Sequence, residues 1–111
     1  MNVYDTANRL AQKIKTSEEY NNFKTAKQAI SLNAELKKQI DEFEKARYEV
    51  QITAMQTGKN DEEGFKKVQE MYAKLLENND AKKFFEPETK FNILFADVNK
   101  IIGESVRDIM E

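Results

Sequence analysis

The sequence predicts an all-α protein folded as an antiparallel helical bundle. Residues that break helices are scarce, because the 111 residues include only three glycines and one proline, while 34% are charged. Apolar side chains recur every three or four positions over long stretches, which is the period of an amphipathic helix. A chain of this length suits a single helical domain spanning residues 1–111. Acidic residues precede basic ones by four positions in a set of pairs typical of solvated helix faces: Asp41–Lys45, Glu62–Lys66, Glu63–Lys67, Glu70–Lys74 and Glu86–Lys90.

The first two predicted helices are short. Residues 3–15 carry apolar side chains on one face and form the first helix. Thr16 then reads as the N-cap of a second helix, because Glu19 stands three residues later and completes a capping box. This second helix is expected to end near Ile30.

A long hairpin of two helices follows. Asn33 is expected to cap a third helix over residues 34–56. Gly58 can stop that helix in the left-handed conformation, and Asn60 can cap a fourth helix over residues 61–77. Because the loop between them is short, the third and fourth helices should run antiparallel.

The last helix is expected to be long and apolar. Asn78–Asp80 should end the fourth helix and cap a short segment that holds Phe84 and Phe85. Pro87 lacks a backbone N–H and disfavours helix in the residue before it, so the pattern predicts a break or kink there. The final helix is then expected over residues 87–110, with Pro87 in its first turn.

The apolar stripe of this final helix is broader than packing on one side requires, because apolar residues occur in adjacent pairs such as Ile101–Ile102. A helix that is central in its own bundle would explain the excess. The first two helices are too short to cover it, however, so the pattern favours a homodimer. Gly103 could let a partner helix approach closely, or it is simply a glycine tolerated within the helix. The predicted shared surface, called here the C-terminal face, consists of Phe91, Phe95, Val98, Ile102, Gly103 and Val106.

Composition excludes several classes of function. The chain contains no cysteine and no histidine, which removes thiolate nucleophiles, serine–histidine triads and the His-containing di-iron site of helical bundles. A net charge of −2 supplies no general attraction for nucleic acid or anionic membranes. No signal peptide or membrane span is recognisable in the sequence. The absence of cysteine fits a reducing cytosol, and no cofactor is expected.

Two minor interpretations concern charged residues. Acidic side chains on the hairpin could hold Mg²⁺ or Mn²⁺ in a carboxylate-only site, although a solvated helix surface explains them more simply: Glu42, Glu49, Glu70 and Glu77. Lys82 and Lys83 stand beside Phe84, and lysines next to an aromatic ring can contact single-stranded RNA. The simpler interpretation is an ordinary charged surface.

Arg47 falls inside the apolar stripe of the third helix. It could form a buried ion pair or anchor an interface, since arginine is enriched among the residues that dominate binding energy. Alternatively, its aliphatic stem covers apolar surface while the guanidinium reaches water.

Three segments carry a family resemblance: VYDTANRLAQKIKTSEEYNNFKTAKQAI, NAELKKQIDEF and FNILFADVNKIIGESV. With them the chain resembles the YlbF/YmcA family of small bacterial helical proteins, and most of all its YheA-like branch. The resemblance implies an all-helical fold, dimerisation, a cytoplasmic location and a non-enzymatic role. Relatives act in regulatory assemblies linked to competence, sporulation, biofilm formation and RNA processing. Iron–sulfur binding in such assemblies depends on cysteines, so it does not carry over to this chain.

The functional prediction is a helical adaptor or regulatory protein that dimerises and binds other, unidentified proteins. One alternative is an RNA-binding accessory module that uses Lys82, Lys83 and the neighbouring phenylalanines. The other is a helical-bundle enzyme with a carboxylate-bound metal.

Overall fold

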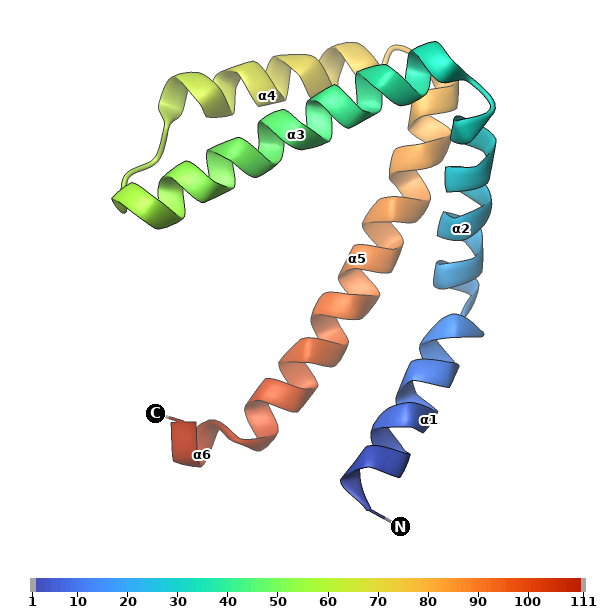
Figure 1. Ribbon diagram of the computed structural model, residues 1–111, viewed down its shortest axis with the longest axis vertical. Helices are drawn as coiled ribbons and strands as arrows, with labels where there is room; N and C mark the ends of the chain where they lie inside the picture. The colour runs from blue at the N-terminus through green and yellow to red at the C-terminus, as the bar shows by residue number, and fades with distance from the viewer. Residues whose placement is uncertain (1, 111) are drawn as a thin grey trace. The chain divides into compact units, whose positions relative to one another are not determined.

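The computed structural model describes residues 2–110, which contain helices and no strand (Figure 1). The predicted all-α class is therefore confirmed. The helices, in chain order, are α1 (Val3–Lys15), α2 (Glu18–Ser31), α3 (Ala34–Thr57), α4 (Glu62–Leu75), α5 (Asn79–Ser105) and α6 (Arg107–Met110).

The chain divides into two compact units. One unit is Gln28–Lys83, which includes α3 and α4, and the other combines residues 2–27 with residues 84–110. Helices α2 and α5 each continue from one unit into the other. The expectation of a single domain over residues 1–111 stays a prediction.

The boundary between α1 and α2 differs from the prediction by one residue. Thr16 was expected to cap α2, and this is wrong. Its backbone N–H and its hydroxyl both bond to the carbonyl oxygen of Gln12, at 3.0 and 3.1 Å, so Thr16 ends α1. The hydroxyl of Ser17 caps α2 instead and accepts a hydrogen bond from the Tyr20 N–H at 3.1 Å. The predicted bounds of the first helix are confirmed.

The hairpin of α3 and α4 has the predicted cap at its start and the predicted stop at its turn. The side chain of Asn33 accepts a hydrogen bond from the N–H three residues on, at 3.1 Å. Gly58 ends α3 with φ 69°, in the left-handed region. Asp61 rather than the expected Asn60 caps α4, because its carboxylate accepts the Gly64 N–H at 2.9 Å. A carboxylate there also favours the positive end of the helix dipole.

Helices α3 and α4 pack side by side and antiparallel (Figure 1), as predicted. The ring of Phe43 stacks on Tyr72 with centroids 5.5 Å apart. Burial of large apolar side chains gives about 1.5–3 kcal/mol each and is the main contribution that holds such a pair together. The buried side chains of the two helices are Leu36, Ile40, Phe43, Val68 and Leu75.

Helix α5 runs without interruption through Pro87, so the predicted break and a final helix beginning at that residue are wrong. Asn78 starts the helix, and its side chain accepts the Asp80 N–H at 2.8 Å. Proline removes only the bond to the carbonyl four residues earlier, that of Lys83, which belongs to an exposed residue and can be hydrated. Buried side chains keep the preceding turns helical: Ala81, Phe84 and Phe85.

The helix ends earlier than predicted, at Ser105, and a short α6 follows. The hydroxyl of Ser105 donates to the carbonyl oxygen of Ile102 at 2.6 Å, and the Val106 N–H bonds to the carbonyl of Gly103 at 3.3 Å. Serine bonding back to the preceding turn and the low helix propensity of glycine both weaken the helix at this point. None of the helices within residues 2–110 is long and apolar enough to span a membrane.

Candidate interaction surface

A cluster of aromatic rings joins α2 to α5. Phe23 of α2 lies 5.8 Å from Phe84 and 5.7 Å from Phe91, measured between ring centroids, and Tyr20 lies 6.0 Å from Phe91. Tilted and edge-to-face pairs at these distances are favourable arrangements of aromatic rings. The cluster therefore fixes α2 against α5 at the start of the C-terminal face.

Cover for this face decreases beyond Phe91. Phe95 stacks on Phe91 with centroids 5.9 Å apart, yet 46% of Phe95 is exposed. Val98 is half-buried, whereas Ile102 and Val106 are 51% and 41% exposed. Phe95, Val98 and Ile102 follow one another at helical spacing, so the single chain leaves a continuous apolar stripe in contact with water, and exposed Val106 follows in the turn after α5.

Gly103, which the sequence placed at the closest approach of a partner helix, lies in open space in the single chain. A Cβ atom added there would meet nothing within 4 Å. Any close contact at this glycine must therefore come from outside the chain.

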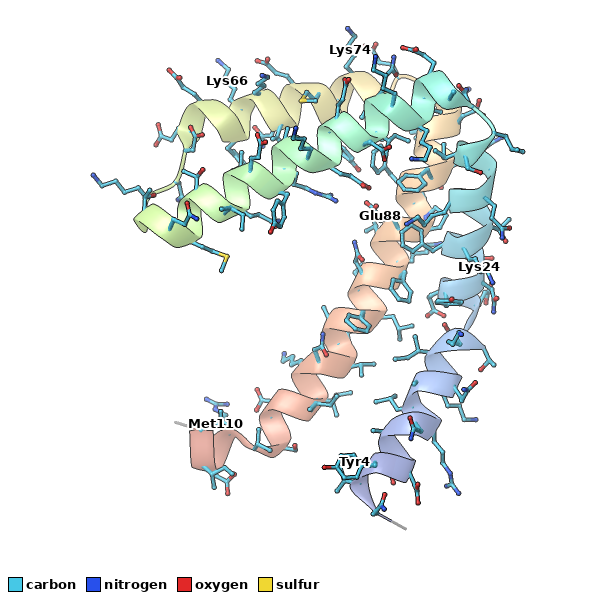
Figure 2. All side chains as sticks on the ribbon, in the orientation of Figure 1. Tyr4, Lys24, Lys66, Lys74, Glu88 and Met110 are labelled. Atoms are coloured by element: carbon cyan, nitrogen blue, oxygen red, sulfur yellow. The ribbon has the colours of Figure 1, made fainter. Side chains whose placement is uncertain are left out.

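Helix α1 is also poorly covered. Within the described residues it contains no buried side chain. Leu10 and Ile14 are half-buried, while Val3 and Tyr4 are 80% and 79% exposed. Figure 2 shows Tyr4 projecting from the N-terminal end of this helix. Two amphipathic helices of one unit thus both expose apolar side chains.

The acidic residues proposed for a metal site are all exposed. Glu42 and Glu77 line a hollow of about 630 Å³ between α3 and α4, together with Lys74, whereas Glu49 and Glu70 do not line it. In the part of the chain that the structure describes, no three His, Cys, Asp or Glu side chains are grouped to hold a metal ion. The arrangement gives the carboxylate-metal alternative no support.

The residues proposed to contact RNA separate into two kinds. Lys82 and Lys83 are exposed. Phe84 is only 4% exposed and packs against Phe23 and Phe85, with its ring centroid 5.3 Å from that of Phe85. A buried ring cannot stack on a base, so only the two lysines are available for an RNA contact.

Two charged residues lie among apolar ones. Arg47 is half-buried, and its guanidinium stands 5.2 Å from the centroid of the Phe43 ring, a cation–π geometry. Glu88 of α5 is only 7% exposed, and sequence reasoning missed it. Its position four residues after buried Phe84, on the apolar side of the helix, was the signal that could have identified it.

Comparison with known proteins gives consistent matches over nearly the whole chain. Residues 3–107 match a family model described as "Control of competence regulator ComK, YlbF/YmcA". A UPF0342 protein of Desulfitobacterium hafniense is 32% identical over 115 residues, covering 99% of this chain and 89% of the relative. One from Clostridium novyi is 31% identical over 108 residues, covering 97% and 95%. Another from Staphylococcus aureus strain JH9 is 32% identical over 109 residues, covering 98% and 96%.

Proposed function

Because this chain belongs to the YlbF/YmcA family, we propose that it is a cytoplasmic, non-enzymatic adaptor or regulatory protein that acts as a homodimer and binds other proteins. The family description names control of a competence regulator, which supports a regulatory role. The protein partner of this chain is not identified by its residues.

The observation that carries the proposal is the exposed C-terminal face. Phe95, Ile102 and Val106 are each between 41% and 51% exposed. They follow Phe91 along the chain, and Phe91 is covered by the rings of α2. Removing large apolar side chains from water contributes about 25 cal/mol per Å² of buried area. A monomer that exposes several such side chains in a row is therefore stabilised by association.

A second copy of the chain is the simplest occupant of this face. A two-fold dimer places the same surface of each copy against the other, so each exposed apolar residue of this face becomes buried in both copies. Gly103 has free space around it and allows the two helices to approach without a Cβ clash.

Sedimentation equilibrium at micromolar concentration tests the dimer. We expect the unmodified chain to sediment as a dimer, and Phe95→Glu and Ile102→Glu to sediment as monomers, because a buried unpaired carboxylate is strongly unfavourable. Circular dichroism should show whether each variant keeps its helical content. An unmodified chain that is monomeric at micromolar concentration would refute the proposal.

Ile93→Glu is a matched control on the same helix. Ile93 is 57% exposed, similar to Ile102, but stands nine positions earlier, which is roughly two and a half helical turns and therefore the opposite face. We expect this variant to remain a dimer. Dissociation as complete as that of Ile102→Glu would show that the effect is not specific to the C-terminal face.

A further inference from the structure

The apolar stripe of the C-terminal face continues in the sequence beyond the point where α5 ends. Ile102 and Ile109 are seven positions apart, which in an uninterrupted helix places them within about 20° of each other. Val106, four positions after Ile102, would fall in the same row. In the single chain α5 stops at Ser105, and a short turn separates it from α6 (Figure 1). Val106 and Ile109 are left 41% and 78% exposed.

Local hydrogen bonds hold this break in place. In a continuous helix the carbonyl oxygen of Ile102 would accept the Val106 N–H. Here that oxygen accepts the Ser105 hydroxyl at 2.6 Å, and the Val106 N–H bonds to the carbonyl oxygen of Gly103 at 3.3 Å. A serine hydroxyl that bonds to the preceding turn competes with the backbone and bends helices. Within the described residues α6 contains no buried side chain, so no packing opposes this local preference.

Pro87 shows how packing changes the outcome in the same helix. Proline disfavours helix more strongly than serine or glycine does, yet α5 continues through Pro87. The side chains of Phe84, Phe85 and Glu88 beside it are buried, whereas every residue from 101 to 110 is exposed. Helix stability in proteins comes mostly from packing of an amphipathic face rather than from propensity. Cover over the last turns of α5 should therefore close the break at Ser105.

We propose that association joins α5 and α6 into one continuous helix, which brings Val106 into line with the C-terminal face and adds Ile109 to it. This inference rests on the proposed homodimer, which supplies the covering copy, and adds a conformational change to it. Burial of these two side chains in each copy offsets the loss of the Ser105 hydrogen bond and the low helix propensity of a β-branched valine. The break at Ser105 thus couples the end of the chain to its oligomeric state.

A proline at position 107 distinguishes the broken helix from the continuous one. Arg107 is the first residue of α6, and proline is tolerated at the first position of a helix. In a continuous helix the same proline would lose the hydrogen bond to the carbonyl oxygen of Gly103 and clash with it. We therefore expect Arg107→Pro to keep the fold of the single chain. Its dimer dissociation constant should rise about ten-fold or more, because the last contacts of the face are lost in both copies.

Arg107→Ala is the matched control for this variant. It removes the same side chain, which pairs with Glu104 at 3.3 Å on an exposed surface, but leaves the backbone able to form helix. Exposed ion pairs contribute little, so we expect the dissociation constant to change by less than about three-fold. Sedimentation equilibrium measures both variants. An equal effect of alanine and proline would assign the loss to the side chain and overturn the inference.

A second pair of variants tests the register of the joined helix. Ile109 and Met110 are adjacent and are 78% and 77% exposed in the single chain, so neither stabilises the monomer by packing. In a continuous helix Ile109 lies in line with Ile102, while Met110 lies about 100° further round the helix. Ile109→Glu should therefore raise the dissociation constant about ten-fold or more, and Met110→Glu should have a much smaller effect. Equal effects would contradict the register.

The Cα chemical shifts of residues 105–109, measured by NMR, report the break directly. In the monomeric Phe95→Glu variant we expect non-helical values at Val106, and in the unmodified dimer we expect helical values through Ile109. If the unmodified chain dimerises and Phe95→Glu is monomeric, but these shifts do not differ or Arg107→Pro associates normally, the inference fails and the dimer stands. If the unmodified chain is monomeric, both fail.

Discussion

The α3–α4 hairpin and the C-terminal half of α5 both carry regular apolar stripes, but only the hairpin buries its own. Phe43 of α3 is 2% exposed and stacks on Tyr72 of α4. Ile102 also lies within the apolar stripe of its helix, α5, but is 51% exposed. A stripe in the sequence therefore shows that a helix needs a partner, while only the structure shows whether the partner is in the same chain.

The largest expected effect contrasts one phenylalanine from each region. Phe43→Ala removes a buried, stacked ring and should lower the free energy of unfolding by about 3–5 kcal/mol. Phe95→Ala removes a ring that is 46% exposed, so its cost should be smaller and should depend on protein concentration, because association is coupled to stability. Urea denaturation at two protein concentrations measures both. Equal, concentration-independent losses would remove the distinction between the regions.

The helix ends differ in how well the sequence predicts them. Asn33 and Gly58 were predicted correctly because each is the only residue at its helix end that suits the role. Thr16 and Asn60 were wrong by one position because each has a neighbour, Ser17 or Asp61, that caps equally well, and propensity does not separate adjacent candidates.

Pro87 was misjudged for a different reason. Local rules place a helix boundary at a proline, but buried side chains before it hold α5 together at the cost of one backbone hydrogen bond. At the candidate site, periodicity predicted which residues share a face. It could not predict that Phe84 would be buried while Phe95 is exposed, since that depends on where α2 ends its contact with α5.

The next effect concerns the turn of the hairpin. Gly58 has φ 69°, a conformation that costs a residue with a side chain roughly 1–2 kcal/mol. Gly58→Ala should therefore lower the free energy of unfolding by about that amount without changing the dissociation constant of the proposed dimer. Urea denaturation and sedimentation provide the two measurements. A stability equal to that of the unmodified chain would mean that the turn tolerates another conformation.

Gly103 makes the matching test on the C-terminal face. It is helical, and a Cβ there would meet nothing in the single chain, so Gly103→Ala should stabilise the monomer by up to about 1 kcal/mol. In the proposed dimer the same methyl group would meet the partner helix and raise the dissociation constant. At low protein concentration we therefore expect the helical content of the variant to rise, and at high concentration we expect its association to weaken. An unchanged dissociation constant would remove Gly103 from the interface.

The smallest expected effect is on RNA binding at the N-terminal end of α5, the end opposite the C-terminal face. Lys82 and Lys83 offer positive charge without an accessible ring, because Phe84 is 4% exposed. Two lysines alone give a weak, salt-sensitive attraction, so we expect no shift of a single-stranded RNA in an electrophoretic assay at about 0.15 M salt. The Lys82→Glu, Lys83→Glu variant should behave in the same way. A shift that persists at that salt concentration and is lost in the variant would favour the RNA-binding alternative. Stacking of Phe84 on a base would require this ring to leave its contact with Phe23. The N-terminal part of α5 would then be exposed to a partner, as the C-terminal face is.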